Sequence, residues 1–143
     1  MRKFKNLNRA QVKKLASGLA KKYSGKDVVI GLVGELGAGK TTFTKDFGSF
    51  LGIKKIKSPT FIIGSTYPLK NQTLYHYDFY RLSDSKQLRP LGFEEIFKSK
   101  NRIVLIEWVD KFPKIAQVCD LIINLKPSGK NLRHVTLETR NSK

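Results

Sequence analysis

The chain has 143 residues, of which 40% are hydrophobic and 10% aromatic, and 28 Lys and Arg against 11 Asp and Glu give it a formal charge of +17. A chain of this size and composition can bury one core without disulfide or metal staples, which excludes disorder for most of its length. We therefore expect a single domain, residues 1–143, that carries its charge on a folded surface.

Cysteine usage and hydropathy exclude several classes of protein. Cys119 is the only cysteine, so an internal disulfide and a Cys-based zinc site are both excluded, as is usual in a reducing, cytosolic setting. Residues 1–8 are basic but lack the apolar segment of a signal peptide, and no apolar stretch approaches the roughly 18 residues that span a bilayer. We expect a soluble, cytoplasmic protein without membrane contact.

The strong positive charge would attract RNA, DNA, anionic lipid or an acidic protein. Of the basic residues 21 are Lys and 7 are Arg, and lysine gives diffuse attraction rather than bidentate readout of bases or phosphates. Sequence-specific recognition is therefore not indicated. A functional polyanion surface and a merely solvated lysine-rich surface both remain open.

The first half of the chain predicts helix, buried strand, glycine loop and helix. A helix is expected over 9–22, where a capping-box pattern precedes apolar residues at helical spacing. The run 27–33 is apolar almost throughout, which favours a central parallel strand buried on both faces. After the glycines of 34–39, phenylalanines at helical intervals mark a second helix that Gly52 ends.

The second half of the chain predicts a hairpin and three further strands around a short helix. Turn residues separate two strand patterns that we expect to pair, and a fully apolar run later in the chain indicates another buried strand. The expected segments are strands at 61–67, 74–79, 103–106, 121–125 and 132–138 and a helix at 92–97. Together these elements predict an α/β fold with a central, mostly parallel sheet flanked by helices.

Residues 34–41 read G-E-L-G-A-G-K-T, which satisfies the phosphate-loop pattern G-x-x-x-x-G-K-[ST] between a predicted strand and a predicted helix. Glycines let successive backbone N–H groups point at a phosphate, and the helix N-terminus adds partial positive charge. We expect Lys40 to bridge the β- and γ-phosphates and Thr41 to offer its hydroxyl to Mg²⁺. Glycines that serve only in tight turns would not explain the lysine and the threonine.

A phosphate loop works with a carboxylate at the end of a neighbouring strand, which helps to hold the metal. Glu107 follows the apolar run 103–106 and is the candidate. It would coordinate Mg²⁺ directly or through water, or orient the attacking water. The alternative is a carboxylate at a solvent-exposed strand end.

A second polar cluster lies at His76-Tyr-Asp78-Phe-Tyr-Arg81. On a strand His76 and Asp78 face one way and their aromatic neighbours the other, so one face is polar and one belongs to the core. Asp78 is a candidate for positioning water or Mg²⁺, and Arg81 for meeting a phosphate or a partner's acid. The alternative is a structural Asp78–Arg81 salt bridge. His134 is far from His76 in sequence, so a His-based metal site is not expected.

The nucleotide class follows from what the sequence lacks. It contains no N-K-x-D element for guanine, which favours ATP. It also has neither the length nor the arginine cluster of a small-molecule kinase lid, which favours an ATPase that acts on another protein. A small-molecule kinase and an RNA-binding module, in which the loop grips nucleic-acid phosphate, are the two alternatives.

Four motifs lie at 34–43, 58–60, 76–82 and 107–108. In their order and spacing they resemble the TsaE (YjeE) family, the ATPases of bacterial tRNA threonylcarbamoyladenosine biosynthesis. The resemblance extends over about residues 11–125. The resemblance implies a single P-loop ATPase domain that uses ATP and Mg²⁺. It implies action with TsaB and TsaD to install threonylcarbamoyl on adenosine 37 of tRNAs that read codons beginning with A. Turnover by the isolated chain is expected to be slow, because the loop region shows no evident arginine finger.

The resemblance also implies roles for single residues. Thr41 and Glu107 fall where the family binds Mg²⁺, Asp78 falls on the acid implicated in hydrolysis, and Trp108 takes the place of the family's E-W tryptophan. With Lys40, Asp78 and Glu107 form the expected catalytic set. The residues expected to bind the nucleotide are Glu35, Leu36, Gly37, Ala38, Gly39, Lys40, Thr41 and Thr42.

Two further segments bear on conformational switching and on the binding of partner proteins. Residues 58–60, Ser-Pro-Thr, resemble a switch-like segment near the γ-phosphate. Residues 83–89 lack the acidic stretch that relatives often carry there, which leaves the charge of a partner-facing loop open. The general basicity exceeds what the resemblance implies, and it indicates either direct tRNA contact or no function at all.

Overall fold

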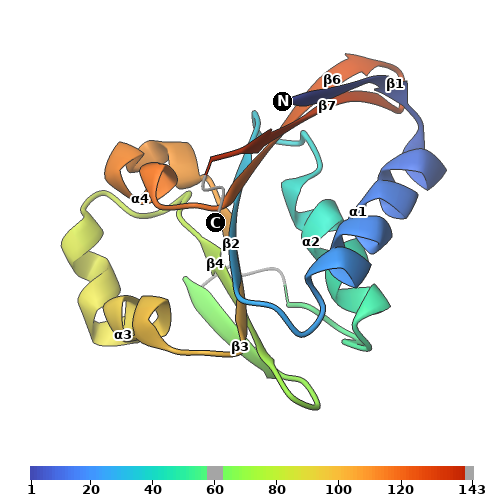
Figure 1. Ribbon diagram of the computed structural model, residues 1–143. Coiled ribbons are helices and arrows are strands. Elements are labelled where there is room, and N and C mark those ends of the chain that lie inside the picture. The colour runs from blue at the N-terminus through green and yellow to red at the C-terminus, as the bar shows by residue number, and fades with distance from the viewer. Residues whose placement is uncertain (58–62, 141–143) are drawn as a thin grey trace.

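A computed structural model describes residues 1–57 and 63–140 (Figure 1). Strands and helices alternate through its first half, and two 3₁₀ segments, Ser85–Leu91 and Val109–Lys111, lie in the second. The remaining elements are β1 (Arg2–Leu7), α1 (Arg9–Tyr23), β2 (Val28–Val33), α2 (Lys40–Phe50), β3 (Gly64–Pro68), β4 (Thr73–Asp78), α3 (Phe93–Lys98), β5 (Arg102–Glu107), α4 (Pro113–Gln117), β6 (Leu121–Gly129) and β7 (Leu132–Thr139).

All seven described strands form one sheet in the order β1-β7-β6-β2-β5-β4-β3. The four central strands β6, β2, β5 and β4 are mutually parallel, whereas β3 and the β6–β7–β1 end pair antiparallel. The expected α/β class with a central, mostly parallel sheet is thus confirmed. The register places Asp78 of β4 beside Glu107 of β5, and Glu107 beside Leu32 of β2, so three strands end at one edge.

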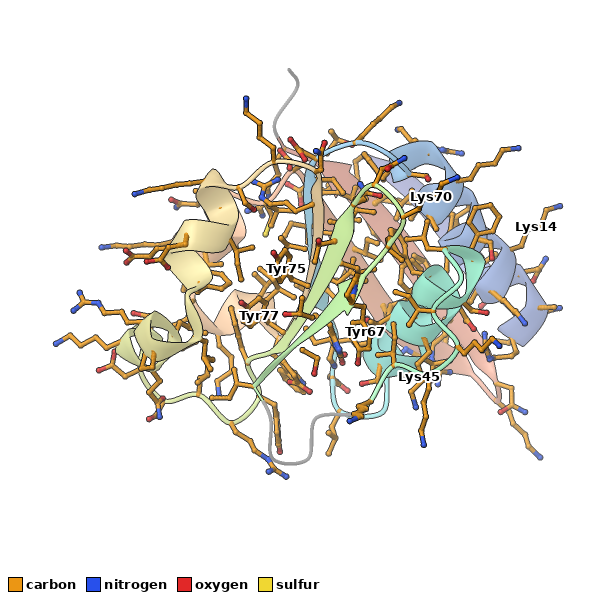
Figure 2. The ribbon with its side chains drawn as sticks, turned by 90° about the horizontal axis from the view of Figure 1, so that it is seen from below. Lys14, Lys45, Tyr67, Lys70, Tyr75 and Tyr77 are labelled. Atoms are coloured by element: carbon orange, nitrogen blue, oxygen red, sulfur yellow. The ribbon has the colours of Figure 1, made fainter. Side chains whose placement is uncertain are left out.

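Helices cover both faces of the sheet (Figure 1). The long helices α1 and α2 lie side by side on one face, over an aliphatic core with Phe43 and Phe47. The short helices α3 and α4 lie on the other face, over a core rich in aromatic rings. Figure 2 shows the alternation along the hairpin: Tyr67 points toward α2, and Tyr75 and Tyr77 point toward α3.

Helix α1 begins at a capping box, as expected. The Asn8 side chain accepts a hydrogen bond from the Gln11 N–H, and the Gln11 side chain accepts one from the Asn8 N–H. Arg9 at the first turn forms two hydrogen bonds with the buried carboxylate of Asp46 on α2, at 2.6 and 2.9 Å. This ion pair links α2 to the N-terminal end of α1, which is the end nearest the glycine loop.

The sequence patterns did not predict β1, the two 3₁₀ segments or α4. β1 is an edge strand of mostly exposed, basic residues in which only Phe4 and Leu7 are half-buried, so it lacks the apolar alternation of a strand. The hairpin was predicted correctly, although β3 begins at Gly64 and the expected residues 61 and 62 lie outside the described part. No helix in the described residues is both long enough and apolar enough to cross a membrane.

Candidate nucleotide-binding site

The glycine loop connects the end of β2 to the start of α2, as its sequence pattern predicted. Gly37 and Gly39 have φ of 81° and 104°, a left-handed region in which a side chain is strained. Gly34 is required for a different reason, because a Cβ there would lie 2.6 Å from the Leu125 carbonyl oxygen of β6. The loop is therefore both curled and pressed against the sheet.

Lys40, the first residue of α2, is buried against the loop that precedes it. Its Nζ donates hydrogen bonds to the carbonyl oxygens of Gly34 at 2.5 Å and Glu35 at 2.9 Å, and it lies 4.0 Å from the ring centre of Trp108. Burial lowers the pKa of Lys40, and the nearby carboxylates, Glu107 first, oppose that shift. The ammonium group is thus held inside the curl of the loop by acceptors that a phosphate oxygen can replace.

Thr41, Glu107 and His76 form a hydrogen-bonded chain from α2 across two strands. The Thr41 hydroxyl donates to Glu107 Oε1 at 2.7 Å, and the other carboxylate oxygen lies 2.5 Å from His76 Nε2. Glu107 and His76 are both almost fully buried, which contradicts the alternative of a solvent-exposed carboxylate at a strand end. A buried imidazole that bonds one oxygen fixes the orientation of the carboxylate and leaves the other oxygen toward Thr41.

Asp78 ends β4 on the same edge of the sheet. Its Oδ1 accepts a hydrogen bond from the Tyr80 N–H at 3.0 Å, which orients the side chain. Burial raises the pKa of Asp78 and the charge of Glu107 raises it further, against the opposing effect of that hydrogen bond. The predicted alternation on β4 is confirmed, because His76 bonds Glu107 while Tyr77 and Phe79 pack in the aromatic core.

Trp108, the residue directly after β5, has an unusual backbone conformation. Its φ of 61° is left-handed, and its N–H donates to the Leu32 carbonyl oxygen of β2. The turned backbone directs the indole ring over Lys40 and against the ring of Tyr80, whose centre lies 5.0 Å away. Trp108 therefore contacts the loop lysine as well as the neighbouring aromatic core.

A cavity of about 330 Å³ lies where these groups meet. Hydroxyl and carboxylate oxygens are the ligands that Mg²⁺ takes alongside phosphates, and the Thr41–Glu107 pair supplies both. The donor set therefore fits a magnesium–nucleotide complex. The lining residues are Leu36, Gly37, Gly39, Lys40, Thr41, Thr42, Asp78, Tyr80, Glu107 and Trp108.

The structure brings together most, but not all, of the residues that the sequence singled out. Ala38 is buried under the loop, and Glu35 is exposed but contributes its carbonyl to Lys40. Arg81 is exposed in the turn after β4. Residues 58–60, the expected switch-like segment, lie outside the described residues.

Sequence reasoning missed Arg133, which reaches the glycine loop from β7. Its guanidinium donates to the carbonyl oxygens of Ala38 at 2.8 Å and Gly37 at 3.3 Å. It also lines a second cavity, of about 430 Å³, that adjoins Gly39 and Thr42 on the α1 side of the loop. No local motif marks Arg133, because 95 residues separate it from Ala38 and only the sheet order brings them together.

Comparisons with known proteins agree with this architecture. The family model described as "Threonylcarbamoyl adenosine biosynthesis protein TsaE" matches residues 7–135. Several relatives carry the name tRNA threonylcarbamoyladenosine biosynthesis protein TsaE. The Bacillus subtilis protein is 36% identical to this chain over 135 residues, which cover 94% of this chain and 83% of the relative. The Rickettsia felis protein is 37% identical over 137 residues, which cover 94% of this chain and 78% of the relative. A relative of that name in Haemophilus influenzae is 36% identical over 114 residues, 79% of this chain and 72% of its own length.

The fold is also shared with a solved structure. The crystal structure of Bacillus subtilis YdiB superposes with a TM-score of 0.76 at 32% sequence identity and covers 98% of this chain and 86% of its own. The expected P-loop NTPase fold is thereby confirmed. The chain belongs to the TsaE family of threonylcarbamoyl adenosine biosynthesis proteins.

Proposed function

We propose that this protein is a Mg²⁺-dependent ATPase that serves tRNA threonylcarbamoyladenosine biosynthesis. The observation that carries the proposal is that the glycine loop meets Thr41 and Glu107 in one cavity, with the Glu107 carboxylate hydrogen-bonded to the buried His76. A loop that only binds phosphate does not need a hydrogen-bonded carboxylate beside it. Hydrolysis, in contrast, needs a coordinated metal ion and an oriented water molecule. The names of the relatives supply the pathway.

The loop and α2 supply binding. Backbone N–H groups of the loop and the N-terminus of α2 face the phosphates, and Lys40 exchanges its carbonyl partners for phosphate oxygens. The second cavity, beside Thr42 and lined by Asn8, Arg9 and Arg133, is the place for the nucleoside. Adenine is preferred because the sequence has no guanine-binding element.

The strand ends supply the rest of the chemistry. When bound, Mg²⁺ neutralises charge on the β- and γ-phosphates, and Thr41 and Glu107 are the residues that would hold it. His76 keeps the Glu107 carboxylate turned toward Thr41. Asp78, whose raised pKa suits a group that handles protons, orients the attacking water.

The partners follow from the family to which the chain belongs. The proposed partner proteins are TsaB and TsaD, and the proposed compartment is the cytoplasm. The proposed process is the threonylcarbamoylation of adenosine 37 in tRNAs that read codons beginning with A. The chain would hydrolyse ATP slowly by itself and faster in the complex. Direct contact with tRNA is part of the same proposal.

Calorimetry with ATP, GTP and Mg²⁺, followed by phosphate-release assays with and without TsaB and TsaD, tests this function. We expect Mg²⁺-dependent binding of ATP in preference to GTP, and stimulation of a slow basal rate by the two proteins. Absence of adenine-nucleotide binding by the folded chain would refute the proposal. Transfer of labelled phosphate from ATP to a metabolite would favour the kinase alternative, and fast hydrolysis by the chain alone would contradict the partner-dependent activity.

A further inference from the structure

The two helical layers differ sharply in charge balance. Helices α1 and α2 contain seven basic residues and one acidic residue, Asp46, which is buried and paired with Arg9. Residues 84–120, which form the opposite layer and β5, contain seven basic and six acidic residues. Lysine is thus common on both sides, and the α1–α2 side differs by having almost no carboxylates. A general preference for lysine in the composition would not produce that difference.

The lysines of this layer lie on its outer surface. Lys14 and Lys21 occupy the exposed side of α1, opposite the buried Ala16 and Ala20, and Lys45 is exposed on α2. Figure 2 shows Lys14, Lys45 and Lys70 projecting on the same side of the sheet, away from α3. We call this the α1–α2 lysine surface; it consists of Lys13, Lys14, Lys21, Lys22 and Lys45 with Lys54, Lys55 and Lys57 of the loop that follows α2, all exposed.

The chemistry of this surface suits nucleic acid better than protein. The buried centre of a protein–protein interface is depleted in lysine and rich in aromatic and apolar side chains. Phe50 is the one large apolar residue of α1 and α2 that is more than a third exposed. A surface of exposed lysines with small polar neighbours such as Ser17 and Ser49 is typical of sites that bind phosphate backbones.

We propose that the α1–α2 lysine surface binds the phosphate backbone of folded RNA without reading its sequence. Lysine forms point-charge contacts with phosphates, so the binding is strongly salt-dependent and tolerant of base changes. None of the eight lysines lines the 330 Å³ cavity, which leaves the nucleotide site accessible when RNA is bound. The inference extends the proposed role in tRNA modification, because that process supplies an RNA, but it does not require ATP hydrolysis.

Matched charge variants test the proposal. The triple variant Lys14→Glu/Lys21→Glu/Lys45→Glu reverses three charges on the α1–α2 lysine surface. The control Lys86→Glu/Lys98→Glu/Lys114→Glu makes the same change in net charge on exposed residues of the other layer. Fluorescence anisotropy with an unmodified tRNA transcript, at several salt concentrations, measures affinity and salt dependence. We expect the first variant to lose at least about tenfold in affinity at low salt and to flatten the log–log salt slope by about two to three, and the control to lose less than about threefold.

Three outcomes would overturn the proposal. They are no tRNA binding by the unmodified chain at about 50 mM salt, equal losses in the two variants, or equally tight and salt-sensitive binding of polyglutamate, which would indicate an acidic protein partner. The milder Lys→Gln version of both triple variants, with circular dichroism, separates loss of contact from loss of fold. Calorimetry with ATP is run in parallel, so a failure of the proposed ATPase is seen independently of RNA binding.

Discussion

The candidate site consists of two halves that differ in how the chain builds them. The loop half, residues 34–42, is continuous in sequence and runs from the end of β2 into the first turn of α2. The strand-end half consists of His76 and Asp78 on β4 with Glu107 and Trp108 at the end of β5, about thirty residues farther along the chain. The loop half presents backbone N–H groups and one cation, whereas the strand-end half presents carboxylates and rings.

This difference predicts a division of labour. Backbone N–H groups and an ammonium bind phosphate in the ground state as well as in the transition state, so they contribute mainly to affinity. Carboxylates that hold a metal or a water act on charge that develops during hydrolysis, so they contribute mainly to turnover. The following variants test that division, beginning with the largest expected effect.

Substitution Glu107→Gln is expected to reduce Mg²⁺-dependent hydrolysis on the order of 10³-fold. The amide keeps the shape of the side chain but loses the negative charge with which Glu107 would hold Mg²⁺ beside Thr41. Phosphate release as a function of Mg²⁺ concentration measures the effect, and Glu95→Gln, on an exposed part of α3, is the control. A rate within threefold of the unmodified chain would remove Glu107 from the reaction.

Substitution Lys40→Ala is expected to weaken ATP binding about 100-fold. In the proposed complex the ammonium exchanges its two carbonyl partners for phosphate oxygens, and a hydrogen bond to a charged group contributes about 1.5–3 kcal/mol, which corresponds to roughly tenfold to 100-fold in affinity. Calorimetry measures the dissociation constant, with Lys98→Ala on α3 as the control for loss of one positive charge. Unchanged affinity would mean that the loop half does not bind the phosphates.

Substitution Asp78→Asn is expected to lower kcat about 100-fold while the affinity for ATP changes by less than threefold. The amide oxygen can still accept the Tyr80 N–H, so the turn after β4 persists while the charge is removed. Single-turnover hydrolysis and calorimetry separate the two quantities. Equal losses in rate and affinity would make Asp78 a structural residue and break the division between the halves.

Substitution Arg133→Leu is expected to weaken ATP binding about tenfold and to leave kcat at saturating ATP within twofold. The two hydrogen bonds to loop carbonyls hold the curl of the loop, and a tenfold effect means that about 1.4 kcal/mol of their free energy is expressed in ATP binding. Arg133→Lys retains the charge without the planar fork and separates the electrostatic field from the hydrogen bonds. A loss in kcat alone would assign Arg133 to the transition state instead.

The same division explains how far the sequence could predict the structure. The loop half carries its own signal, since Gly37, Gly39, Lys40 and Thr41 lie within five residues and their spacing matches a motif. Glu107 and Asp78 were found because each follows or ends an apolar strand pattern. The order of the sheet, which brings Arg133 to the loop and His76 to Glu107, depends on long-range pairing that no local pattern encodes.

Edge elements were predicted least well, for a related reason. Among the described strands β1 pairs only with β7, and it exposes most of its basic side chains, so its pattern resembles that of a solvated segment. The capping box of α1 was predicted because its hydrogen bonds join residues close in sequence. Strand β2 was predicted because burial on both faces gives it a continuous apolar run. Where structure is imposed by neighbours, as in the turn at Trp108, the sequence alone gives no signal.

Cys119 provides the smallest expected effect and tests whether the α4 side of the sheet opens independently of the nucleotide site. Burial raises the pKa of this thiol to about 12, so it stays protonated at neutral pH, and its stabilising effect is present below the ordinary thiol pKa and lost as the pH rises toward 12. Its Sγ packs on the Ile115 carbonyl of α4, a helix of five residues on the face away from the loop.

A helix so short opens locally at less cost than the whole domain. We therefore expect slow labelling of Cys119 by a disulfide reagent, at a rate that changes less than twofold when ATP is added. If labelling required global unfolding, ATP at 100 times its dissociation constant would slow it about 100-fold, because only the folded chain binds nucleotide. That result would show that the loop and the α4 side unfold as one unit.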